Sequence, residues 1–219
     1  MDMRNGNWKT LVAVVVCLCS GVVYGQSSGG GMSAEPISDE VFGRMKGLSY
    51  KENCTVPLEE LRYLKVLHYD GNGEVATGEI VCNKLISDDL LYIFGELFEA
   101  KYPIESVRLV DDFGADDNES MVNNNSSAFN FRYVAGTTTL SKHSLGMAID
   151  INPLYNPYVK EGGDKLIVEP TEAREYVDRG REFPYKIDTS DLCYKLFIER
   201  GFEWGGNWTS LKDYQHFEK

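Results

Sequence analysis

The chain of 219 residues contains only three histidines, and two of them occur close to acidic residues late in the sequence. His143 precedes Asp150 by seven positions, and Asp213 precedes His216 by three. Two imidazoles and one carboxylate are the protein ligands of an open catalytic zinc site, in which water takes the fourth position. Zinc in such a site lowers the pKa of the water and polarises a carbonyl group. His143, Asp150 and His216 are therefore candidate zinc ligands, and Asp213 is a candidate general base.

Spacing alone does not separate this hypothesis from ordinary structural roles. A single histidine is more often a hydrogen-bonded structural residue than a ligand, and an aspartate near Pro153 can cap a turn. Two histidines and an aspartate spread over 74 positions lack the specificity of an H-E-x-x-H motif. The third histidine, His68, follows a strand-like run away from this group and is predicted to be structural.

Three separated blocks of the sequence resemble the M15 family of zinc peptidases. The stretch "SKHSLGMAIDINP" resembles the family motif S-x-H-x-x-G-x-A-x-D, and "WGGNWTSLKDYQHFE" is similar to its C-terminal block. The stretch "NNNSSAFNFR" resembles the segment before the first ligand block. Together the blocks resemble D-alanyl-D-alanine carboxypeptidases, VanY and endolysin L-alanyl-D-glutamate peptidases over roughly residues 90–219.

The resemblance implies a role for each matching residue. The residues that match the family's zinc ligands are His143, Asp150 and His216. Asp213 matches the general base that acts on the zinc-bound water, and Arg132 matches the arginine that steadies the substrate carbonyl. Ser141 matches a serine that helps to hold the peptide, while Trp208 beside the Gly205-Gly206 turn is a candidate wall of the substrate cleft or a core residue.

The function that the resemblance implies is zinc-dependent hydrolysis of peptide bonds in bacterial peptidoglycan stem peptides. The resemblance leaves two choices for the bond that is cleaved, that of a D-Ala-D-Ala carboxypeptidase and that of an L-Ala-D-Glu or L,D-type peptidase. The reason is that the D,D-dipeptidases have glutamate where this chain has Asp213. The alternative is a zinc-containing binding or signalling module of the same fold, such as the Hedgehog signalling domain. Asp213 and Arg132 at their expected positions favour the enzyme. A structural zinc site usually has four protein ligands rather than three.

Several elements are expected to position these residues. Hydrophobic periodicity and turn signals predict a helix from residue 38, a hairpin over 61–83 around "DGNG", a helix from Ser87 to Pro103, a strand over 104–110, a polar loop over 111–127, a strand-like piece over 128–136, a small strand between His143 and Asp150, and helices over 171–180 and 188–202. Strands and helices alternate without a regular βαβ rhythm. The pattern predicts an α+β fold, a single domain with a small antiparallel sheet flanked by helices, and the resemblance implies the Hedgehog/D,D-peptidase-like form of it.

The N-terminus has the pattern of an exported protein. Arg4 and Lys9 precede "LVAVVVCLCSGVVYG", an apolar run too short for comfortable membrane crossing, and small residues before Gln26 suit cleavage. We therefore expect a signal peptide over 1–25, a Gly/Ser-rich flexible tether over 26–37 and the peptidase domain over 38–219. A retained anchor is the alternative. The expected location is periplasmic or extracellular, with lipid anchoring less favoured.

Composition narrows the range of partners. The formal net charge of −12 argues against binding to nucleic acid or to an anionic membrane surface. The expected partners are peptidoglycan peptides. We expect no membrane span after processing, and we expect the chain to be a monomer. Of the five cysteines, Cys54, Cys82 and Cys193 lie outside the leader, so at most one internal disulfide is possible.

Overall fold

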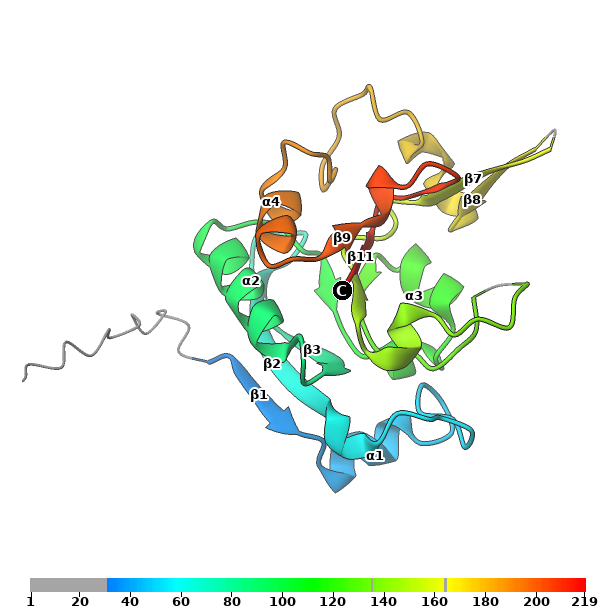
Figure 1. Cartoon of the computed structure of the whole chain (residues 1–219). Coiled ribbons are helices and arrows are strands. Elements are labelled where there is room, and N and C mark those ends of the chain that lie inside the picture. Colours follow the sequence, from blue (N-terminus) through cyan, green and yellow to red (C-terminus); the bar gives the residue numbers. More distant parts are fainter. Residues whose placement is uncertain (1–30, 135, 164) are drawn as a thin grey trace, which may run out of the picture.

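The computed structural model describes residues 31–134, 136–163 and 165–219, and Figure 1 shows their arrangement. The helices are α1 (Asp39–Met45), α2 (Ser87–Glu99), α3 (Asp117–Val122) and α4 (Leu192–Glu199). The strands are β1 (Ser33–Pro36), β2 (Leu61–Tyr69), β3 (Val75–Asn83), β4 (Ser106–Val107), β5 (Asn125–Ser126), β6 (Ala148–Asp150), β7 (Tyr158–Gly162), β8 (Lys165–Glu169), β9 (Glu203–Trp204), β10 (Lys212–Asp213) and β11 (His216–Glu218). Short 3-10 turns cover Leu58–Glu60, Val110–Phe113, Lys142–Leu145, Thr171–Tyr176 and Gly205–Asn207.

The signal peptide predicted for residues 1–25 lies outside the described residues. Among the described helices, none is long and apolar enough to cross a membrane.

The predicted hairpin is confirmed as β2 and β3, which pair antiparallel from Leu61 opposite Asn83 to Tyr69 opposite Val75. Asp70 organises the turn, because its carboxylate accepts hydrogen bonds from the backbone N–H groups of Asn72 and Glu74, both at 2.9 Å. Helix α2 packs on β2 and buries one face, as its apolar spacing predicts. The hairpin and α2 together form much of the main core.

Part of the predicted tether is a strand. Residues Ser33–Pro36 form β1, which pairs antiparallel with β2 along its outer edge, Ser33 opposite Lys65 and Pro36 opposite Arg62. The expectation of a flexible tether over 26–37 is therefore wrong for these four residues. Their backbone pairs with β2, which makes them part of the folded sheet.

Two small antiparallel sheets hold the C-terminal part of the chain together. In one sheet, β11 is the central strand between β6 and β9, and in the other, β7 lies between β10 and β8. The β7–β8 hairpin projects away from the body of the molecule in Figure 1. The mixed α+β architecture is as predicted, but the described residues form three such three-stranded sheets and one parallel pair, β4–β5, instead of one small sheet.

The polar tract over 111–127 is not the loop that its composition predicts. It contains α3 and β5, and Asn124, Asn125 and Ser126 are buried. The Asn125 carboxamide accepts hydrogen bonds from the Ser106 hydroxyl at 2.9 Å and the Arg108 N–H at 2.8 Å, and donates to the Arg108 carbonyl at 3.0 Å. Buried amides that are hydrogen-bonded in this way are stable inside a protein, so polar composition gave the wrong prediction here.

Several other predicted elements are shorter than expected or differ in type. The described residues of the range 128–136, which are 128–134 and 136, form no strand; instead the N–H of Phe129 donates to the Val81 carbonyl and that of Phe131 donates to the Ser49 carbonyl, each at 3.0 Å. The strand predicted over 104–110 is reduced to β4, and the helix predicted over 171–180 is a 3-10 turn. The helix predicted over 188–202 is confirmed as α4, which Asp191 caps through the N–H of Cys193.

Candidate active site

His143 lies on the 3-10 turn Lys142–Leu145, and only Ala148–Asp150 of the predicted strand is extended. Ser141 caps this turn, since its hydroxyl oxygen accepts a hydrogen bond from the N–H of His143 at 3.2 Å. Gly146 ends the turn with a left-handed φ of 67°. A Cβ on Gly146 would lie 2.6 Å from the backbone nitrogen of Asn83, so glycine allows the turn to pack directly on β3.

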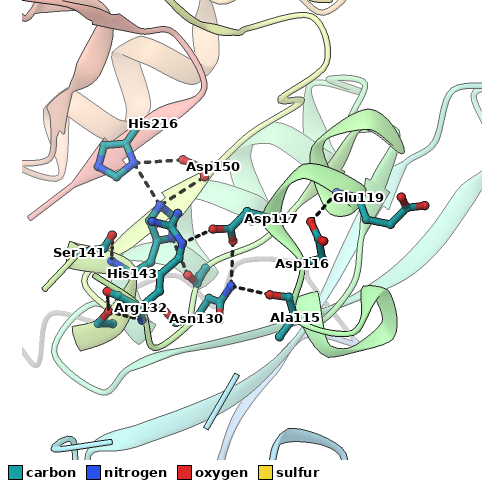
Figure 2. A network of polar contacts seen from close by, with 12 residues as sticks. Ala115, Asp116, Asp117, Glu119, Asn130, Arg132, Ser141, His143, Asp150 and His216 are labelled. Atoms are coloured by element: carbon teal, nitrogen blue, oxygen red, sulfur yellow. Dashed lines mark hydrogen bonds and ion pairs between the residues drawn. The ribbon is translucent and has the colours of Figure 1, made fainter. Parts of the chain in front are cut away.

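Asp150 and His216 meet across the β6–β11 ladder, where they are directly opposite each other. Side chains of opposite residues lie on the same face of a sheet. His216 Nδ1 is 3.1 Å from Asp150 Oδ1, and His143 Nε2 is 3.3 Å from Asp150 Oδ2. The two ring nitrogens are themselves 3.1 Å apart (Figure 2). The structure thus brings together the three predicted ligands, whose ligand atoms all lie within 4.8 Å of one another.

The other nitrogen of each imidazole is bound to an acceptor that faces away from this group. His143 Nδ1 is 2.6 Å from the Ala128 carbonyl oxygen, which only accepts, so Nδ1 must carry the hydrogen. His216 Nε2 is 3.0 Å from Glu218 Oε2 and donates to that carboxylate. When both rings are neutral, the lone pairs of His143 Nε2 and His216 Nδ1 converge with the Asp150 carboxylate. Three acceptors at this spacing fit a cation between them, and the outer partners are those that orient metal-bound histidines.

The electrostatics of the three residues favour a bound cation. Burial alone would lower the pKa of His216, but hydrogen bonds to Asp150 and Glu218 raise it to about 10. Burial raises the pKa of Asp150, yet the two histidines outweigh this effect and hold the pKa well below its usual range. The hydrogen bond to His216 likewise lowers the pKa of Glu218. The group therefore holds Asp150 and Glu218 as anions on either side of His216, and a metal ion bound to Nδ1 would take the place of the proton there.

Asp213 lies on β10, three residues before His216, and its backbone pairs with Tyr158 of β7. Its carboxylate oxygen Oδ1 is buried and has no hydrogen-bond partner among the described residues. Burial raises the pKa of Asp213 to about 7, with His216 lowering it and Asp150 raising it further. A carboxyl group with this pKa is half-ionised near neutral pH, as a group that both accepts and donates protons requires.

Arg132 is held through its backbone to the turn that contains His143. Its N–H donates to the Ser144 hydroxyl oxygen at 2.8 Å, and its carbonyl accepts from the N–H of Ser141 at 3.1 Å. Its guanidinium forms an ion pair through Nε with Asp117. Nothing in the sequence pointed to Asp117, because it lies in the acidic tract that composition predicts to be a loop.

Of the two tryptophans on either side of Gly205-Gly206, Trp208 lies at the site and Trp204 lies in the core. Trp208 is half-buried, and its ring centroid is 5.3 Å from that of His216, so it lies against the site. Trp204 is a core residue whose Nε1–H donates to the Tyr214 carbonyl at 2.9 Å.

The remaining histidine and the cysteines lie outside the site. His68 is buried, with Nδ1 2.6 Å from the Ile104 carbonyl, and is structural as predicted. The cysteines predicted to form at most one disulfide are all free.

A comparison with known protein families finds a match over the C-terminal part of the chain. Residues 135–219 match a family model described as D-alanyl-D-alanine carboxypeptidase, of the M15 peptidases. The match confirms the resemblance seen in the motifs and supports a peptidase, and it covers about two fifths of the chain. It includes the three candidate ligands and Asp213, whereas Arg132 and Asp117 precede it. No curated protein and no solved structure matches the chain.

Proposed function

We propose that the protein is an exported zinc-dependent peptidase that hydrolyses peptide bonds in peptidoglycan stem peptides. The observation behind this proposal is the convergence of His143 Nε2, His216 Nδ1 and the Asp150 carboxylate, with both imidazole N–H groups bound to acceptors on the outside. The family match to D-alanyl-D-alanine carboxypeptidases supports the choice of substrate.

His143, Asp150 and His216 would hold the zinc ion. A zinc ion bound by two imidazoles and one carboxylate lowers the pKa of a coordinated water molecule and polarises a carbonyl group. Ala128 and Glu218 contribute by fixing which nitrogen of each imidazole is free of hydrogen.

Asp213 acts as the general base and then as the general acid. With a pKa of about 7, its carboxylate takes the proton of the attacking water and passes it to the amine that leaves when the peptide bond breaks. The Oδ1 atom has no hydrogen bond to any described residue, so it can hydrogen-bond to water or substrate without losing a protein contact.

Arg132 stabilises the negative charge that develops on the scissile carbonyl oxygen. Guanidinium N–H groups placed at that oxygen stabilise the transition state more than the ground state. Asp213 as a base and Arg132 as a cationic hydrogen-bond donor, together with the three candidate zinc ligands, support an enzyme. They favour it over the alternative, a zinc-containing binding or signalling module of the same fold. We propose Trp208, which lies against His216, and Ser141 as further contacts for the substrate.

Digestion of purified muropeptides, followed by mass spectrometry, tests this function. Release of the terminal D-Ala would identify a D-Ala-D-Ala carboxypeptidase, and cleavage between L-Ala and D-Glu would identify an endopeptidase. Asp213→Asn should lose activity by a factor of about 10² to 10⁴ while keeping its zinc. His143→Ala should lose about one zinc ion per chain. If the zinc-loaded wild type cleaves none of a broad set of muropeptides, the binding-module alternative replaces the enzyme.

Export is tested separately by sequencing the N-terminus of the mature protein. The leader pattern predicts that it begins at Gln26. A mature chain that begins at Met1 would contradict cleavage and support a retained anchor.

A further inference from the structure

Asp117 is the first residue of α3, and both of its carboxylate oxygens have partners (Figure 2). Oδ2 forms the ion pair with Arg132 Nε. Oδ1 accepts a hydrogen bond from the Asn130 carboxamide at 2.8 Å, and the same carboxamide donates to the Ala115 carbonyl at 3.3 Å. The carboxylate is thereby held in one orientation before any substrate arrives.

The backbone on the other side of this ion pair is fixed to the ligand-bearing turn. The N–H of Asn130 donates to the His143 carbonyl at 3.2 Å, and the N–H of Arg132 donates to the Ser144 hydroxyl oxygen. Residues 130–132 and the turn Lys142–Leu145 therefore run side by side. Asp117 holds the far end of the Arg132 side chain, while the turn that contains His143 holds its backbone.

The ion pair is at the surface of the site, where it adds little to folding stability. The Arg132 and Asp117 side chains are 31% and 33% exposed, and solvent screens a pair with this degree of exposure, so that it contributes little to stability. The guanidinium has five N–H donors in a rigid plane. The Asp117 carboxylate pairs with Nε as a charge, without an aligned hydrogen bond from its N–H, and the two terminal nitrogens are left for a second acceptor.

We propose that Asp117 is a positioning residue for Arg132, which directs the terminal guanidinium nitrogens toward the carbonyl oxygen of the bound peptide. Arg132 is a long side chain, and fixing it in advance lowers the entropy that substrate binding must otherwise remove. The proposal rests on the proposed peptidase function, because it assigns Asp117 a part in binding the peptide at the same site.

The test compares two isosteric substitutions at neighbouring aspartates. Asp117→Asn removes the charge that binds Arg132, whereas Asp116→Asn makes the same change at the residue that caps α3 through the N–H of Glu119. Asparagine is an equally good cap, so both variants should fold. We expect Asp117→Asn to lose about tenfold or more in kcat/KM on the muropeptide that the wild type cleaves, with unchanged zinc content and melting temperature. Asp116→Asn should resemble the wild type.

Two further measurements separate positioning from a general structural effect. In the Arg132→Ala background, Asp117→Asn should cause no additional loss, because Asp117 acts only through Arg132. In ¹H–¹⁵N spectra, the Arg132 Nε–H signal should shift in Asp117→Asn and stay in place in Asp116→Asn. Asp117→Glu, which keeps the charge, should retain more activity than Asp117→Asn.

The outcomes distinguish this proposal from the proposed function. If the wild type is active and Asp117→Asn equals Asp116→Asn, the positioning role is wrong while the peptidase function stands. An additional loss in the Arg132→Ala background would also overturn it, because Asp117 would then act by another route. A wild type that cleaves no peptide refutes the peptidase function itself, and the role of Asp117 with it.

Discussion

Gly205 lies at the start of a 3-10 turn, directly against Asp213, and a single methyl group added there should displace Asp213, the proposed general base. A Cβ on Gly205 would meet the Asp213 carbonyl oxygen at 2.6 Å and its Cβ at 2.8 Å, whereas ordinary contact begins at 3.4 Å. Neither atom can move away by rotation of a flexible side chain. Gly205→Ala must therefore displace the backbone of β10 by about 0.6–0.8 Å.

The expected effect of this displacement is on the rate rather than on metal binding. A misplacement of about 1 Å at a catalytic group costs about 100-fold in rate, so kcat/KM should fall by about 10- to 100-fold. This corresponds to about 1.4–2.8 kcal/mol of lost transition-state stabilisation. His216 should stay in place, because β11 is paired with β6 on one side and β9 on the other.

The assay measures kcat/KM on a cleaved muropeptide together with zinc content for Gly205→Ala and a matched control. Gly95→Ala in α2 is the control, since a Cβ there has nothing within 4 Å and alanine in a helix is more stable than glycine by about 0.5–1 kcal/mol. Wild-type activity in Gly205→Ala would refute the reasoning about β10. A zinc loss as large as the activity loss would show that the displacement reaches β11.

Three other predictions follow from the site and its surroundings. Because Asp213 must be ionised to accept a proton and burial raises its pKa to about 7, kcat/KM should fall as the pH drops through about 7. A bound zinc ion would shift this fall in kcat/KM to lower pH. A kcat/KM that is constant from about pH 4 to 8 would contradict the role of Asp213 as the base. Glu218→Ala removes the acceptor of His216 Nε2 and should weaken zinc affinity by about 10- to 100-fold in a chelator competition. Glu203→Ala, a change at an exposed residue of β9, should leave the affinity unchanged. Equal zinc affinities of the two variants would exclude an orienting role for Glu218. Burial lowers the pKa of His68, so below about pH 6.5 the unfolded chain binds the extra proton and the free energy of unfolding declines as the pH falls. Urea unfolding of His68→Asn should show a shallower decline between about pH 5 and 6.5, and the same slope in both proteins would count against His68 as its source.

The parts of the site that the sequence predicted share a strong local signal. His143, Asp150 and His216 were candidates by residue type, and the resemblance of two blocks to family motifs favoured them as zinc ligands; the structure brings their side-chain nitrogen and oxygen atoms together. The β2–β3 hairpin and α2 were predicted because each is long enough for its periodicity to appear, with Asp70 and Ser87 marking a turn and a helix start.

The parts that could not be predicted depend on contacts between distant segments. Asn125 is buried because its carboxamide oxygen accepts hydrogen bonds from the Ser106 hydroxyl on β4 and from the Arg108 N–H. No local sequence pattern reveals these contacts. Strands such as β4 and β10 have two residues, too few for a period of two to be recognised. Ser141 matched a peptide-holding residue in the family, and its hydroxyl oxygen turns out to cap the His143 turn, a role that depends on backbone geometry.

The hairpin in the N-terminal part of the chain, where the sequence offers no catalytic motif, supports the turn that contains His143 from two sides. The N–H of Asn83 at the end of β3 donates to the Gly146 carbonyl at 2.8 Å, immediately after the turn that contains His143. Two residues earlier, the Val81 carbonyl accepts from the N–H of Phe129, and the preceding residue, Ala128, supplies the carbonyl that binds His143 Nδ1. One end of β3 thus fixes both the position of the turn and the acceptor that sets the His143 tautomer. Since the family match begins at residue 135, the residues that orient the His143 ring lie outside the segment that the family model matches.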